Sequence, residues 1–156
     1  MGCSSLVSIN FSNLNTKNVK NMREMFYNCF SLYSMDFSNL DLRNVEIMPK
    51  FCYMCYSLVS TNFTNTRTLN LTSYPGMFEY CSNLTSIELT NFEARNIGYL
   101  FGNCPNLRYI DIPFINCQSE YGDIDYGLPN YGTIRININC SDLIQNTLSN
   151  WSIIIS

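Results

Sequence analysis

The amino-acid sequence predicts an α/β solenoid, in which similar coils stack with a parallel sheet on one face and short helices on the other. Five cysteines, at positions 3, 29, 55, 81 and 104, are separated by 26, 26, 26 and 23 residues. A repeat period of about this length is typical of solenoids. Each phrase that starts at one of these cysteines carries a strand pattern followed by a helical pattern. Neither segment can bury its apolar side alone, so the coils must stack.

The strand pattern opens each phrase as C-x-x-L-x-x-I-x-F, for example with Leu6, Ile9 and Phe11. Alternation over its last four positions indicates a strand with one buried face. The third phrase departs most, because Thr61 and Thr66 occupy apolar positions. We expect parallel strands at residues 7–12, 33–38, 59–64, 85–90 and 108–112.

The helical pattern follows each strand, with apolar residues spaced by three and four, as at Val19, Met22 and Phe26. This spacing predicts one or two helical turns on the side opposite the sheet. Pro49 and Pro75 share a position that suits the first turn of a helix. Two asparagine columns, expected to bond backbone groups of neighbouring coils, support the register: Asn13, Asn39, Asn65 and Asn91, then Asn18, Asn44, Asn70 and Asn96.

The phrases "NVKNMREMFYNCFSLYSMDFSNL" and "MFEYCSNLTSIELTNF" resemble the BspA-like leucine-rich repeats of bacterial and protist surface proteins. This resemblance implies a leucine-rich-repeat solenoid, with four full repeats and one partial repeat over residues 1–116. Residues 117–156 are expected to form a C-terminal loop and a capping segment, since "GTIRININCSDLIQNTLSNWSIIIS" is similar to the closing segment of that family. The chain begins in the middle of a phrase, so we expect missing upstream repeats and self-association through an uncapped N-terminal coil.

Composition narrows the classes of function. The net charge of -3 arises from 12 acidic and 9 basic residues, and the basic residues are scattered singly. A nucleic-acid partner is therefore not expected, because no basic stripe is present. No apolar run reaches the roughly 18 residues of a membrane span. With no histidine in the chain, no serine–histidine–acid constellation exists, and we expect neither an enzyme nor a cofactor.

The repeated cysteines are expected to be free and buried, because cysteine packs as a small hydrophobe. Stacked parallel side chains would also hold their β-carbons too far apart for a good disulfide. Cys52 and Cys55 form a C-x-x-C that also fits a redox or zinc half-site, although a second pair is lacking.

The C-terminal loop leaves two further alternatives open. Cys117 and Cys140 flank it and could form a disulfide in an oxidising compartment. Glu120, Asp123 and Asp125 lie among glycines, where carboxylate oxygens could bind calcium. The segment lacks the full spacing of a calcium loop, however, and a solvated turn explains it better.

The exposed face of the sheet is the candidate binding surface. Alternation directs small hydroxyl, amide and acidic side chains outward, and solenoids use such extended faces for binding. Arg108 and Tyr109 interrupt the polar pattern and are the strongest single candidates for contact. The predicted ligand-binding residues are Asn10, Ser34, Asp36, Ser60, Asn62, Ser86, Glu88, Arg108, Tyr109 and Asp111.

The leading hypothesis is a non-enzymatic binding or adhesion module of a surface or secreted protein, which recognises a host or cell-surface protein or glycan. The cell-surface or extracellular location is what the family resemblance implies. One alternative is a structural spacer or self-assembling repeat array. Another is a carbohydrate-active enzyme that would use Asp36, Glu88 or Asp111.

Overall fold

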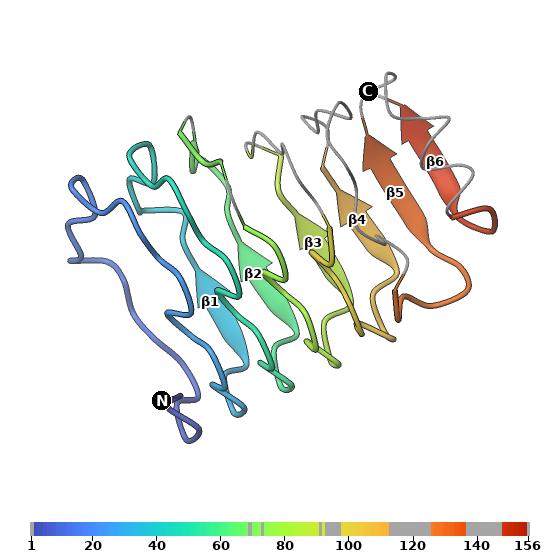
Figure 1. Ribbon diagram of the computed structural model, residues 1–156, viewed down its shortest axis with the longest axis horizontal. Coiled ribbons are helices and arrows are strands. Elements are labelled where there is room, and N and C mark those ends of the chain that lie inside the picture. Colours follow the sequence, from blue (N-terminus) through green and yellow to red (C-terminus); the bar gives the residue numbers. More distant parts are fainter. Residues whose placement is uncertain are drawn as a thin grey trace.

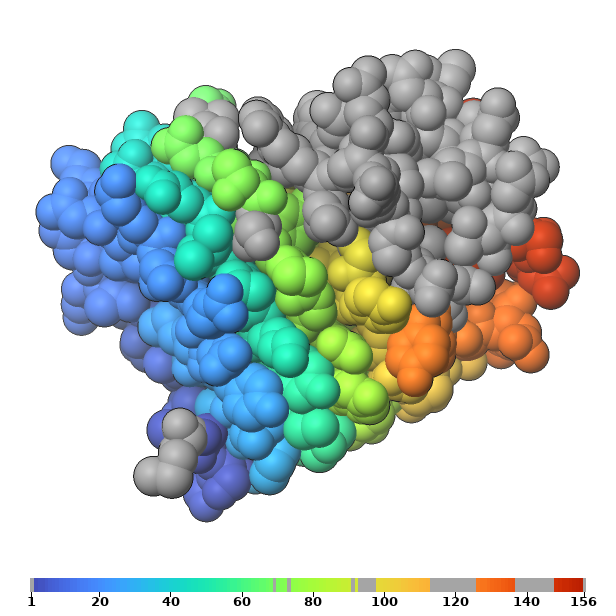
Figure 2. Space-filling view, in the orientation of Figure 1, coloured from blue at the N-terminus to red at the C-terminus, as the bar shows by residue number. Residues whose placement is uncertain are grey.

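The computed structural model is a solenoid whose coils follow one another from the N-terminal end to the C-terminal end (Figure 1). It describes residues 2–68, 70–72, 74–90, 92, 98–112, 126–136 and 148–155. Successive coils form neighbouring diagonal bands on the surface (Figure 2). We number the coils from the repeated cysteines: coil 1 spans residues 3–28, coil 2 29–54, coil 3 55–80 and coil 4 81–103, and coil 5 begins at residue 104.

The strands are short and pair in parallel, which confirms the predicted parallel-sheet solenoid. They are β1 (Ser34–Asp36), β2 (Ser60–Asn62), β3 (Ser86–Glu88), β4 (Tyr109–Asp111), β5 (Thr133–Ile136) and β6 (Ser152–Ile155). Four of the predicted strands contain β1 to β4, whereas residues 7–12 form no regular strand. β5 and β6 lie in the segment expected to cap the array, and they continue the same sheet.

The sheet is interrupted between β2 and β3, which separates a two-stranded sheet from a four-stranded sheet. The interruption coincides with Thr61, which stands where Met35 and Ile87 fill the core in other coils. The Thr61 hydroxyl is buried and has no hydrogen-bond partner among the described residues. An unpaired buried hydroxyl costs free energy, so Thr61 is a local weak point in the third repeat.

The predicted short helices are wrong for the part of the chain that the structure describes, which contains no helix. Consecutive β-turns take their place. In coil 1, the N–H of Met25 donates to the carbonyl of Met22, and the N–H of Cys29 donates to that of Phe26. Turns of this length repeat a buried residue every three to four positions, as a helix does, so apolar spacing alone does not distinguish the two.

Bonding between coils explains why turns form instead of a helix. The N–H of Met22 donates to the carbonyl of Ile47 at 2.9 Å, and that of Phe26 donates to Phe51 at 2.9 Å. In a helix these N–H groups would bond four residues back within the same coil. The turns need left-handed backbone at two columns, which recur through the array: Glu24, Lys50, Gly76 and Tyr99, then Asn28, Met54, Tyr80, Asn103 and Gly127.

The core lies between the sheet and the ladder of turns. The leucine column is fully buried at Leu32, Leu58, Leu84 and Leu107. Burial of each such side chain contributes about 1.5–3 kcal/mol. Phenylalanine rings stack along the axis, with centroids 4.9 Å apart for Phe11 and Phe37. Regular columns therefore give each inner coil the same apolar contacts on both sides.

Candidate binding faces

The sheet face presents a row of exposed serines at the first position of successive strands. Ser34 of β1 is in register with Ser60 of β2, and Ser86 opens β3. All three side chains are exposed, as the alternation predicted. Because paired parallel strands lie about 4.8 Å apart, Ser34 and Ser60 offer closely spaced hydroxyl donors and acceptors. Ser86 continues the row beyond the interruption between β2 and β3.

A second row of side chains, two residues further along each coil, forms hydrogen bonds with the backbone of its own turns. Its side-chain oxygens each accept the backbone N–H two residues on: Asn10 from Ser12 at 2.8 Å, Asp36 from Ser38 at 2.9 Å and Asn62 from Thr64 at 3.0 Å. Such bonds are typical of the Asx turns that end strands. The hydrogen bonds from Ser38 hold the pKa of Asp36 below its ordinary value. The side-chain oxygens of these residues therefore have fewer free acceptor positions for a ligand.

Asp111 continues this row in β4, but the expectation that it is exposed is wrong. Only 2% of Asp111 is exposed, because Arg135 of β5 pairs with it. Arg135 Nε donates to Asp111 Oδ1 at 2.8 Å, and Nη2 donates to Oδ2. This carboxylate raises the pKa of the Arg135 guanidinium. A bidentate pair of this kind holds β5 on β4.

Sequence reasoning missed Arg135, although a usable signal was present. In "TIRI", Ile134 and Ile136 alternate with Thr133 and Arg135 as in the other strands. Extending the strand columns by one coil would have put Arg135 beside Asp111. The segment was instead assigned to the cap.

The other residues predicted at this end lie in different surroundings. Arg108 is half-buried, with its guanidinium 4.7 Å from the ring centre of Tyr131 and its Nη1 donating to the carbonyl of Pro105 at 2.9 Å. Tyr109 is half-buried between Ser86 and Thr133 of the neighbouring strands. Glu88 is exposed. The fold therefore constrains Arg108, and Glu88 keeps an open carboxylate.

A group of exposed apolar side chains was not identified from the sequence. It lies on the segments that follow the repeated cysteines of coils 1 to 3, and we call it the N-terminal aromatic edge: Val7, Phe30, Tyr33 and Tyr56, with exposed fractions of 59%, 38%, 57% and 37%. The Phe30 and Tyr56 rings stack with centroids 5.3 Å apart. Tyr33 lies beside Val7, since its N–H donates to the Val7 carbonyl at 3.0 Å. The available signal was a pair of columns, one and four residues after each cysteine.

The repeated cysteines are structural, and the prediction of free buried thiols is confirmed for Cys29, Cys55, Cys81 and Cys104. Cys3, in coil 1, is exposed. Three of these thiols donate to the carbonyl three residues before the preceding repeated cysteine: Cys55 to Phe26 at 3.1 Å, Cys81 to Cys52 at 3.2 Å and Cys104 to Phe78 at 3.1 Å. Burial raises the pKa of Cys104 to about 12 and also raises that of Cys81.

The C-x-x-C pair is buried within coils 2 and 3. Burial raises the pKa of the Cys52 thiol, and a hydrogen bond from Cys52 lowers that of Cys55. Within the described ranges, no group of three or more histidine, cysteine, aspartate or glutamate residues could hold a metal ion. Cys117 and Cys140, which could form a disulfide in an oxidising compartment, lie outside the described residues, as do the loop carboxylates Glu120, Asp123 and Asp125.

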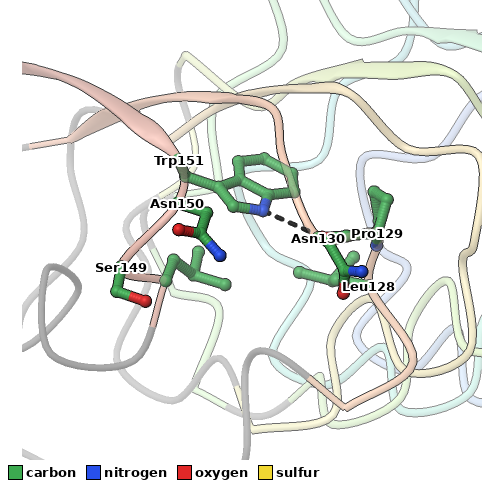
Figure 3. Close-up of a pocket in the computed structure, with 7 residues that line it drawn as sticks. Leu128, Pro129, Asn130, Ser149, Asn150 and Trp151 are labelled. Atoms are coloured by element: carbon green, nitrogen blue, oxygen red, sulfur yellow. Dashed lines mark hydrogen bonds between the residues drawn. The ribbon is translucent and has the colours of Figure 1, made fainter.

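Two hollows lie away from the sheet face. One, of about 140 Å³, separates residues 128–130 from residues 148–151 (Figure 3). The Trp151 indole N–H donates to the Pro129 carbonyl at 3.0 Å and ties these segments together. The other, of about 340 Å³, lies on the loops after β1 and β2. There Arg43 lies against Asp41, and its hydrogen bond lowers the pKa of that carboxyl to about 2.

No helix among the described residues is long and apolar enough to cross a membrane. The stacked coils and the parallel strands define a repeat protein with a β-solenoid fold. The chain belongs to the family described as Mycoplasma protein of unknown function, DUF285, which matches residues 2–108. This span covers coils 1 to 4 and the start of coil 5. Searches of curated proteins and of solved structures gave no match.

Proposed function

We propose that the chain is a non-enzymatic binding or adhesion module of a surface or secreted protein, with repeats of the BspA-like leucine-rich type. In this proposal the sheet face recognises a protein or a glycan. The observation that supports it is the exposed row of Ser34, Ser60 and Ser86, in which Ser34 and Ser60 are paired in register on neighbouring strands. Such a row suits a polar ligand that makes many similar hydrogen bonds across several coils.

The charged side chains beside this row are distributed unevenly along the array. Asp36 and Glu88 expose carboxylates on coils 2 and 4, and Arg135 adds a partly exposed guanidinium beyond them. A ligand that lies along the array would therefore meet acidic groups first and a basic group at the C-terminal end. This asymmetry favours one orientation of a bound ligand.

The proposal is tested by attachment of beads coated with the purified chain to cultured animal cells. The double variant Ser60→Arg with Ser86→Arg places two bulky cations on the face and is expected to reduce attachment at least tenfold. Asn13→Arg with Asn39→Arg adds the same charge at exposed positions after the strands and serves as the control. Equal attachment of both variants and the wild type would contradict the proposal.

A second candidate function, a structural spacer or self-assembling array, is favoured by a different observation. Leu6 and Ile9 of coil 1 are only partly buried, whereas Leu32 and Met35, in the same columns of coil 2, are almost fully buried. A second copy packed against coil 1 would bury this apolar surface. Light scattering should then show a mass that rises with concentration, and Leu6→Lys should abolish the rise. A constant monomer mass would exclude this candidate.

A further inference from the structure

The fold does not require the rings of the N-terminal aromatic edge. Phe30 and Tyr56 stand one residue after the repeated cysteine, where coil 4 has Ser82. Tyr33 stands four residues after it, where coil 4 has Thr85. The turn of coil 4 keeps the same bonding, since the N–H of Asn83 donates to the carbonyl of Tyr56 at 3.2 Å. Polar residues thus satisfy the same turn, and exposed apolar groups that the fold does not need are typical of interaction sites.

The rings leave usable faces. Phe30 and Tyr56 stack on one another, and their column continues with the small residues Ser4 and Ser82 on the two flanking coils. The outer face of each ring is therefore not covered by a further ring. Tyr33 is 57% exposed and makes no ring contact among the described residues. The edge therefore offers flat apolar platforms.

The surroundings of these platforms are polar but uncharged. The five residues after the cysteine are SSLVS, FSLYS, YSLVS and SNLTS in coils 1 to 4. None of these residues carries a charge, and the last of each phrase is the exposed serine of the sheet face. Aromatic platforms thus adjoin a regular row of hydroxyls.

We propose that the N-terminal aromatic edge binds a neutral glycan. The C–H face of a sugar ring is apolar and stacks on an aromatic ring, while its hydroxyls bond to the neighbouring serines. A sialylated or sulfated glycan is disfavoured, because these phrases hold no lysine or arginine and the chain has a net charge of -3. A protein partner is disfavoured because protein hot spots lie in desolvated pockets, whereas the rings of this edge are 37–57% exposed. The inference rests on the proposed binding function and names its ligand class.

The test is binding of the multivalently displayed chain to an array that carries neutral, sialylated and sulfated glycans. We expect binding to neutral members, and a loss of at least tenfold in the double variant Tyr33→Thr with Tyr56→Ser, which introduces small hydroxyl residues like those of coil 4. The single variant Tyr33→Thr should lose at least threefold, and it gives a second reading if the double variant folds poorly. Tyr126→Ser removes an exposed tyrosine outside the edge and should stay within twofold of the wild type.

Three results would overturn the inference. They are no binding to any neutral glycan, binding to charged glycans alone, and neutral binding that survives both tyrosine variants. In the last case, a loss in the variant Ser60→Arg with Ser86→Arg would still support the sheet face. A negative result for glycan binding by the aromatic edge is therefore distinguishable from a negative result for the proposed function, because the cell-attachment experiment tests the proposed function separately.

Discussion

The two halves of the solenoid use the same surface columns for different side chains. Coils 2 and 3 carry rings on the turns before their strands, at Phe30, Tyr33 and Tyr56, where coil 4 carries Ser82 and Thr85. The leucine column and the bonds between coils are the same in both halves. The inner columns thus define the fold, and the outer columns are free to vary. A difference between halves in an outer column is therefore informative about function or about local stability.

Asp36 and Asp111 make this difference concrete, because they occupy the same column. Asp36 is exposed and bonds its own turn, whereas Asp111 is buried against Arg135. The Asp36 carboxylate stabilises the turn after β1, and the Asp111 carboxylate holds β4 and β5 together. The same residue type therefore predicts different consequences of substitution in the two halves.

The largest expected effect follows from removing the partner of Asp111. Arg135→Met should lower the free energy of unfolding by about 2–3 kcal/mol, below the usual cost of breaking a buried pair, because the Arg135 side chain is 37% exposed. Asp36→Asn keeps the turn-forming oxygen and should stay within about 0.5 kcal/mol of the wild type. Urea unfolding measures both. Equal losses would show that the two carboxylates have the same role.

The next effect is a stabilisation at the break between the two sheets. Thr61→Ile replaces an unpaired buried hydroxyl with the side chain that Ile87 provides in coil 4, and it should add about 0.5–2 kcal/mol. Thr85→Ile, at an exposed position, is the control and should change stability by less than about 0.5 kcal/mol. A lower urea midpoint for Thr61→Ile would mean that the site is already fully packed.

Alkaline pH should distinguish Cys104 from Cys55. The pKa of Cys104 is raised by burial from 9.0 to about 12, so the unfolded chain loses this proton first. Stability present below pH 9 should therefore fall as the pH rises toward 12. Cys104→Ala should make the unfolding free energy less dependent on pH in this range. Cys55→Ala should not, because the pKa of Cys55 is lowered. Parallel curves for Cys104→Ala and the wild type would contradict this.

The smallest effect is expected in acid. Hydrogen bonds lower the pKa of Asp41 from 3.8 to about 2 and also lower that of Asp36. Their stabilisation is present above the ordinary pKa and is lost as the pH falls through the lowered values. Asp41→Asn should make the thermal midpoint depend slightly less on pH between pH 4 and pH 2. The variant should therefore lose slightly more stability at neutral pH than at pH 2, and an equal loss at both would contradict this account.

The period of the cysteines and the alternation after them were enough to predict the parallel solenoid and the positions of β1 to β4. The helices could not be predicted correctly, because residues such as Met22 and Phe26 have the same spacing in turns and in helices. The choice between helix and turns depends on whether the backbone N–H groups of these residues bond within their own coil or to the next coil. The next coil lies about 25 residues further along the chain, beyond the reach of a local pattern. Gly76, in the column of Glu24, was the local signal for left-handed turns.

The candidate site was predicted in part. The serine row lies where alternation put it, because strand side chains alternate regardless of their partners. Asp111 was misplaced because its burial depends on Arg135, in a strand that was read as a cap. The aromatic edge was missed because it precedes the strands, where no periodic pattern points outward.

The central claim is that the rings of the N-terminal aromatic edge serve binding and not folding. The most direct test is the free energy of unfolding of the variant Tyr33→Thr with Tyr56→Ser, measured in urea beside the wild type. The account predicts a loss of no more than about 1.5 kcal/mol, the value of one stacked ring pair. A loss of about 3 kcal/mol or more, as for an aromatic ring removed from a core, would contradict it.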